Sequence, residues 1–96
     1  MGIFNLFRRH QEDTATARKA RLLRTGRIAE GSIFDVGTDE TGAVTHIFYH
    51  YEIGGSEYES SQALDDEQRL RLNDFAPGSR ITLRVDPRQP TNSIVV

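Results

Sequence analysis

The 96-residue sequence contains no cysteine and no tryptophan. Without cysteine the chain can form neither disulfides nor thiolate metal sites, and a catalytic thiol is excluded. Small secreted domains are often held together by disulfides, so their absence favours a reducing compartment. We therefore expect a cytoplasmic protein, and we expect packing and hydrogen bonds to supply its stability.

Long hydrophobic runs are also missing. No segment of the sequence approaches the roughly 18 apolar residues that a membrane-spanning helix needs. An export signal would place basic residues ahead of its apolar stretch. Here the apolar residues Ile3, Phe4, Leu6 and Phe7 come before Arg8 and Arg9. This order argues against export and leaves a short apolar tip followed by positive charge, which is typical of segments that contact a membrane surface or a partner.

The net charge of −2 hides an uneven distribution. Residues 1–27 carry seven basic and two acidic side chains, a net charge of +5, whereas the remaining residues carry five basic and twelve acidic ones, a net charge of −7. A basic arm on an acidic body points to a partner that the arm contacts. It argues against nucleic acid on the body, because phosphate binding needs a basic groove.

The clearest structural pattern is a hairpin around Gly54 and Gly55. Before the glycines, one face carries Ile47, Tyr49, Tyr51 and Ile53, and the other carries Phe48, His50 and Glu52. Both central positions of the favoured two-residue turn need positive φ, which suits glycine. With the two glycines as the loop, Ile53 pairs with Ser56, Tyr51 with Tyr58 and His50 with Glu59. We expect Tyr49, Tyr51 and Tyr58 to share the core face.

The segments before the hairpin predict a helix and a strand. Asp13 or Thr14 can cap a helix that runs to about Arg24 and ends at Gly26, with an apolar stripe too weak to predict firm packing. Residues 27–36 then form a strand, in which Gly31 indicates a bulge or a bend.

The segments after the hairpin predict a helix and two strands. Residues 65–73 form one short helix with an acidic first turn and apolar contacts from Leu64, Leu70 and Leu72. Residues 81–85 alternate as a strand, and residues 93–96 add an edge strand after the Asp86-Pro87 stop. We therefore predict a mainly β fold, a small five-stranded antiparallel β-barrel or barrel-like sandwich with an N-terminal helix and one inserted helix. Its parts are a basic arm and helix at 1–24 and a β domain at 25–96.

The β part of the chain resembles a known family. The segments "VTHIFYHYEIGGSEY" and "FAPGSRITLRVDPRQPTNSIVV" are similar to domain of unknown function 3592 over about residues 25–96. The family's opening strand, tyrosine-rich hairpin, Pro-Gly turn and Asp-Pro-x-x-Pro ending match Gly26 to Ile28, Tyr49 to Tyr58, Pro77-Gly78 and Asp86 to Pro90. The tyrosine that usually precedes Asp-Pro is absent. The resemblance implies the fold and no chemistry, and members of the family are often tied to a membrane by helices that this sequence lacks.

No residue pattern indicates an enzyme, a cofactor or a metal. His46 and His50 would stand roughly 13 Å apart on a strand that rises about 3.3 Å per residue, so they cannot share one ion unless a third element brings more ligands. Adjacent acids at Asp65, Asp66 and Glu67 are typical of a helix start rather than of acid–base chemistry. Ser60 and Ser61 lack the glycine-flanked setting of a nucleophile. We therefore predict a non-enzymatic protein.

Two surfaces remain as candidate contact sites. The first is the N-terminal tip of Ile3, Phe4, Leu6, Phe7, Arg8 and Arg9, which could bind a protein partner or an anionic membrane surface and make the cytoplasmic protein peripheral. The alternative, which we favour over membrane contact, is that Phe4 and Phe7 fill a gap on the β unit or that the tip is disordered. The second is the strip of Phe48 and His50, which with the basic arm could stack the bases of a single-stranded nucleic acid, as small barrels do. The apolar edge strand at residues 93–96 could also pair two copies as a homodimer.

Overall fold

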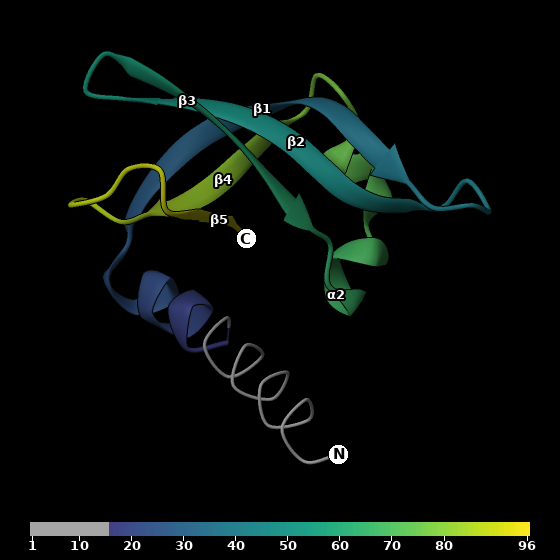
Figure 1. The fold of residues 1–96 in the computed structure, drawn as a ribbon, viewed down its shortest axis with the longest axis horizontal. Helices are drawn as coiled ribbons and strands as arrows, with labels where there is room; N and C mark the ends of the chain where they lie inside the picture. Colours follow the sequence, from purple (N-terminus) through teal and green to yellow (C-terminus); the bar gives the residue numbers. More distant parts are fainter. Residues whose placement is uncertain (1–15) are drawn as a thin grey trace, which may run out of the picture.

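The computed structural model describes residues 16–96 of the chain (Figure 1). An N-terminal helix is described over residues 16–25 and stops directly before Gly26, where the sequence predicts its end. The elements that follow are β1 (Arg27–Thr38), β2 (Val44–Ile53), β3 (Ser56–Ala63), the one-turn helix α2 (Asp66–Arg69), the 3-10 helix η1 (Leu72–Phe75), β4 (Arg80–Val85) and β5 (Ser93–Val95).

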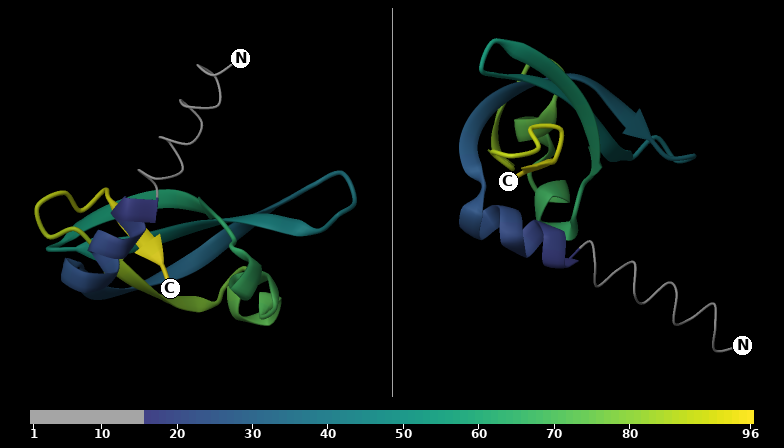
Figure 2. Two further views of the ribbon diagram at one scale, coloured as in Figure 1. Left: turned by 90° about the horizontal axis from the view of Figure 1, so that it is seen from below. Right: turned by 60° about the vertical axis from the view of Figure 1, so that its left-hand side comes forward.

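The five strands form one antiparallel sheet in the order β3-β2-β1-β4-β5. The sheet curls around its inner face, so that the C-terminal segment lies in the opening of the curl (Figure 2). The mainly β, five-stranded antiparallel prediction is confirmed. The sheet is a curled half-barrel, because its edge strands β3 and β5 lie close without forming a backbone ladder.

The glycine turn has the predicted pairing. Gly54 and Gly55 have φ values of 59° and 86°, which lie in the left-handed region that favours glycine. Ile53 pairs with Ser56, Tyr51 with Tyr58 and His50 with Glu59. From Ile47 to Ile53, each residue of β2 therefore faces the side that alternation predicts, with its tyrosines inside the curl.

The core lies on the inner face of the sheet, and the tyrosine rings form its centre. The Tyr49 and Tyr51 ring centroids are 5.9 Å apart, and those of Tyr51 and Tyr58 are 5.5 Å apart. Each buried hydroxyl finds a partner across the curl, because Tyr51 donates to the Pro90 carbonyl and Tyr49 bonds to Ser93 Oγ at 2.8 Å. Burial also raises the pKa of the Tyr51 phenol. The other buried members of this core are Ile33, Ile47, Leu64, Phe75, Ile81, Leu83, Val85 and Val95.

Side-chain amides connect the two edges of the half-barrel. The Gln62 side chain on β3 accepts from the Val95 backbone N–H at 2.8 Å and donates to the Val95 carbonyl at 3.2 Å. Gln68, itself 2 % exposed, donates to the same carbonyl at 3.0 Å. An amide can offer both a donor and an acceptor, so it replaces the backbone of a missing neighbouring strand.

The N-terminal helix packs more firmly than its weak stripe predicts. Leu22 is 1 % exposed, whereas the neighbouring Leu23 is 43 % exposed. Arg18 donates to Asn92 Oδ1 at 2.7 Å beside β5, and Lys19 forms an ion pair with Asp65 at 3.0 Å beside α2. The helix thus contacts both sides of the half-barrel opening.

The prediction of one helix over residues 65–73 is wrong. The backbone of Arg71 (φ −134°, ψ 51°) leaves the helical region, so α2 and η1 are separate. This break allows Phe75 to enter the core at 2 % exposure. Leu64 is buried as predicted, but Leu70 is 88 % exposed and Leu72 is 41 % exposed, so the apolar contacts predicted for them are not made.

A bulge at Gly31 is also not found. Gly31 pairs with Tyr51 on one side and with Ile81 on the other without a break in register. A Cβ at this position would lie 2.7 Å from the His50 carbonyl oxygen and 3.1 Å from Leu83 Cδ1. The glycine therefore permits close approach of the backbones where β1 lies between β2 and β4.

The amide bridge gives a stability prediction. Replacing Gln62 with alanine leaves the Val95 N–H without its partner at the opening. We expect the free energy of unfolding to fall by about 1–3 kcal/mol, the cost of an unsatisfied, partly buried polar group. Urea unfolding of Gln62→Ala measures it, and Ser61→Ala, an exposed neighbour, is the control. Equal stability of the two variants would contradict the bridge.

Candidate functional site: an exposed aromatic patch

A bulge in β1 lies at one large exposed aromatic side chain, Phe34. Ile33 pairs with Tyr49 and Asp35 pairs with Phe48, so Phe34 is an extra residue that opposes nothing on β2. The backbone of Ile33 is held on its other side by the turn before β4, since its N–H donates to Ser79 and its carbonyl accepts from Gly78. Ile33 is 1 % exposed and points into the core, whereas Phe34, the next residue along the strand, is 46 % exposed on the outer face.

Phe34 lies against the two residues that the sequence analysis assigned to a binding face. Its ring centroid is 5.7 Å from that of His50, with an angle of only 14° between the planes. It is 6.4 Å from the Phe48 ring, which is 36 % exposed. We name Phe34, Phe48 and His50 the aromatic patch. It lies on the outer face of β1 and β2, the side away from the tyrosine core.

Phe48 and His50 were predicted for this surface, and Phe34 was not. Alternation along β1 groups Phe34 with Ile28 and Val36, and the structure places Phe34 and Ile28 outside, whereas the bulge brings Val36 to the core side. A signal was present, because two adjacent large residues of one strand, Ile33 and Phe34, cannot both point inward. The other predicted contact residues, Ile3, Phe4, Leu6, Phe7, Arg8 and Arg9, lie outside the described residues.

Carboxylates border the aromatic patch. Glu59 stands opposite His50 on β3, and Glu52 stands directly opposite Glu57 towards the turn. Like charges in directly opposed positions repel each other. Within residues 16–96, no ion pair or hydrogen bond engages the side chains of these three glutamates. We name Glu52, Glu57 and Glu59 the acidic border.

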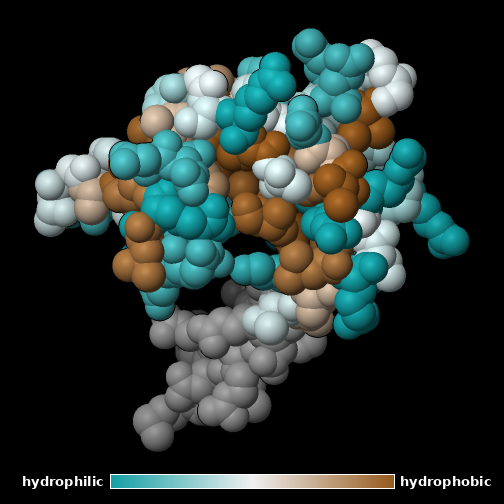
Figure 3. Space-filling model, turned by 180° about the vertical axis from the view of Figure 1, so that it is seen from behind, coloured by the Kyte–Doolittle hydropathy of each residue, from teal (hydrophilic) through white to brown (hydrophobic). Residues whose placement is uncertain are grey.

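Other exposed hydrophobic residues are distributed over the surface. Viewed from behind, hydrophobic areas alternate with hydrophilic side chains (Figure 3). Ile28 is 68 % exposed and Leu70 is 88 % exposed, but neither takes part in an aromatic contact. The aromatic patch differs from them because the Phe34 ring contacts both the His50 ring and the Phe48 ring.

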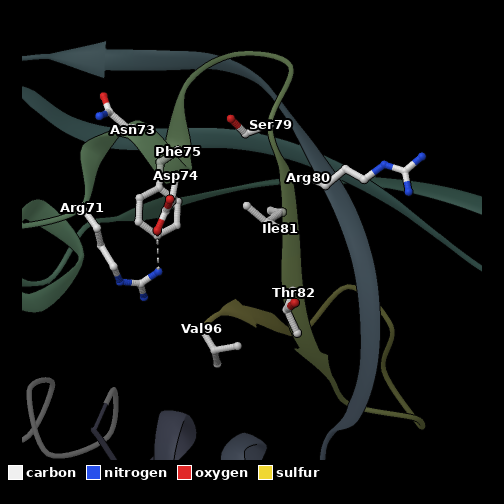
Figure 4. A pocket seen from close by; sticks show the side chains of 9 residues that line it. All are labelled: Arg71, Asn73, Asp74, Phe75, Ser79, Arg80, Ile81, Thr82 and Val96. Atoms are coloured by element: carbon white, nitrogen blue, oxygen red, sulfur yellow. Dashed lines mark hydrogen bonds and ion pairs between the residues drawn. The ribbon is translucent and has the colours of Figure 1, made fainter.

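A cavity of about 400 Å³ lies between η1, β4 and Val96 (Figure 4). Two arginines line it. Arg71 lies 5.1 Å from the Phe75 ring centroid and is bound by Glu67 at 2.7 Å and by Asp74 at 3.4 Å. Arg80 forms an ion pair with Glu30 at 3.9 Å. The arginine side chains at this cavity are therefore already engaged in contacts with neighbouring residues. Among residues 16–96 there is no cluster of three histidine, aspartate or glutamate side chains that could hold a metal ion.

The acidic run at the start of α2 serves the helix. Asp65 accepts from the Gln68 N–H at 2.7 Å, and the Gln68 side chain accepts from the Asp65 N–H at 3.1 Å, which completes a capping box. The backbone hydrogen bond from Gln68, together with Lys19, lowers the pKa of the Asp65 carboxyl. The same carboxylate therefore caps α2 and holds the N-terminal helix.

Comparison with known proteins identifies the family. The family described as Domain of unknown function (DUF3592) matches residues 24–96. The chain therefore belongs to this family, as the resemblance in its sequence indicates. No curated protein and no solved structure gave a match. None of the helices within residues 16–96 is both long and apolar enough to cross a membrane.

The Asp65 cap gives a pH prediction. A carboxyl whose pKa is lowered on folding adds stability above its unfolded pKa near 3.8, and this stability is lost as the pH falls through the lower, folded pKa. At pH 7, Asp65→Ala should cost about 1 kcal/mol, as loss of an N-cap does. Thermal unfolding at pH 7 and pH 2.5 measures the difference from the natural sequence. A difference that did not shrink in acid would contradict the charged cap.

Proposed function

We propose that this domain is a non-enzymatic protein-interaction module and that the aromatic patch is its binding surface. The observation that carries the proposal is the stack of Phe34 on His50 beside Phe48 in solvent. The core gains nothing from these rings, because the inner face of β1 and β2 is already filled by Ile33 and the tyrosines. Rigid exposed aromatic clusters are typical of the centres of protein interfaces.

The acidic border supports a protein partner over the alternatives. Phosphates of nucleic acid and of anionic lipids would be repelled by Glu52, Glu57 and Glu59, although the exposed ring stack alone would suit a base. A cytoplasmic location remains part of this proposal, since a chain without cysteine suits a reducing compartment. Membrane contact through the tip at residues 3–9 is the alternative that the basic arm supports.

A homodimer through the C-terminal edge strand stays a prediction. The hydrogen bonds of Gln62 and Gln68 already occupy the backbone N–H and carbonyl of Val95 on the outer side of β5. A second copy would have to replace these bonds. The aromatic patch therefore offers the more accessible surface for a partner.

Site-specific cross-linking tests the proposal. A benzoyl-phenylalanine at position 34 should cross-link a protein partner in the cells that naturally make this chain. The same group at position 28, where Ile28 is exposed away from the patch, is the matched control and should give less than a tenth of the product. Phe48→Ser in the position-34 protein should abolish the product while leaving the unfolding midpoint nearly unchanged.

Equal products at positions 34 and 28, or no product at either, would contradict the proposal. Two further probes separate the alternatives. Anionic phosphatidylserine vesicles and a mixed-sequence 12-nucleotide single strand should leave the resonances of Phe34, Phe48 and His50 unshifted. A shift of these resonances with the vesicles would favour membrane contact, and a shift with the oligonucleotide would favour nucleic-acid binding.

A further inference from the structure

The strand β3 has a free edge over most of its length. It is the outermost strand on its side of the sheet, and only β2 forms a backbone ladder with it. Its link to β5 is the side chain of Gln62, near its C-terminal end. The stretch from Ser56 to Ser61 therefore has no neighbouring strand within the described chain.

The hairpin geometry determines which backbone groups point away from β2. In an antiparallel pair, residues alternate between those that exchange hydrogen bonds with the partner strand and those that do not. The pair that closes a two-residue turn, Ile53 and Ser56, is of the bonded kind. The N–H and carbonyl groups of Glu57, Glu59 and Ser61 therefore point to the free edge and offer a pattern that an added strand can complete.

A cleft lies beside this edge. It has a volume of about 420 Å³ and separates the C-terminal half of β3 from Thr91, Ser93 and Ile94. Two basic residues also line it, but Arg18 is bonded to Asn92 and Lys19 is paired with Asp65. The charged groups that border the space next to the edge therefore already have partners.

The charge along the edge selects the partner. The edge-facing residues Glu57 and Glu59 carry carboxylates on the outer face, and Glu52 adds a third on β2. Identical edges of two copies would bring like charges together, which opposes self-pairing. A strand with lysine or arginine at alternate positions would place its cations opposite these carboxylates, because side chains two residues apart share one face.

We infer that β3 accepts an extended basic peptide as a sixth strand. Its backbone bonds to the free edge at residues 57–61, and its alternate cationic side chains face the acidic border beside the aromatic patch. This inference deepens the proposed function and rests on it, since it assigns the chemistry of the partner. It also gives a role to the repelling pair of Glu52 and Glu57, which the fold itself does not need.

A defined peptide tests the inference. The probe is a blocked heptapeptide of alternating lysine and valine, added to the full chain labelled with ¹⁵N. The backbone N–H groups of Glu57, Glu59 and Ser61 should gain at least tenfold protection from hydrogen exchange. Those of Ser56, Tyr58 and Ser60 should change little, because they already bond to β2. A heptapeptide of alternating glutamate and valine is the control and should not bind.

Variants of the protein separate charge from strand addition. The double variant Glu57→Lys, Glu59→Lys should weaken binding of the lysine peptide at least tenfold, whereas Glu40→Lys in the distant β1–β2 loop should not. The peptide can be N-methylated on its odd-numbered or on its even-numbered backbone nitrogens. Only one of these two patterns should abolish binding, because only every second N–H of an added strand points to β3.

Two results would overturn the inference. One is no protection at residues 57, 59 and 61 at peptide concentrations up to 1 mM (roughly the weakest binding of interest, about −4 kcal/mol). The other is binding with shifts confined to Phe34, Phe48 and His50. The second result would leave the proposed interaction surface standing and would reject only strand addition, so the two proposals fail separately.

Discussion

The pairing of β2 with both of its neighbours is the constraint on which the rest of the structure depends. Because side chains alternate between faces, one register places Tyr49 and Tyr51 inside the curl and Phe48 and His50 outside. A slip by one residue would exchange these sets. The Gly54-Gly55 turn fixes the register of β2 with β3. On the other side of β2, Gly31 of β1 pairs with Tyr51 and also with Ile81 of β4, and its lack of a side chain permits this close approach.

The bulge at Phe34 changes which later residues of β1 face the core. Alternation alone places Ile33 inside and Phe34 outside. Because of the extra residue, Val36 pairs with Ile47 and packs against the core, although it has the same parity as Phe34. Phe34 belongs to the outer aromatic patch, and the acidic border lies on the same face. Exposed aromatic rings and directly opposed glutamates are features that the fold does not require. Here they lie together on one face, as is typical of functional sites.

Local sequence patterns predicted most of the fold. The features that they did not predict depend on contacts between residues far apart in the sequence. Alternation and turn chemistry predicted the hairpin, the tyrosine core and the strand at residues 81–85. The break between α2 and η1 was not predictable, since it depends on Phe75 reaching a core made by distant strands. The burial of Leu22 and the Gln62–Val95 bridge are also contacts over long sequence separations. The bulge at Phe34 was missed because the pairing of β1 with β2 defines it, and that pairing is not visible in the residues of β1 alone.

The orientation of the Phe34 ring reports directly which way β1 faces when it pairs with β2. In a solution NMR experiment, nuclear Overhauser effects between ring protons report which rings lie within about 5 Å. We expect effects from the Phe34 ring to those of His50 and Phe48, and none to that of Tyr49. Effects between Phe34 and Tyr49, with Ile33 in contact with His50 instead, would show that β1 faces the opposite way and that the register of β1 with β2 is wrong.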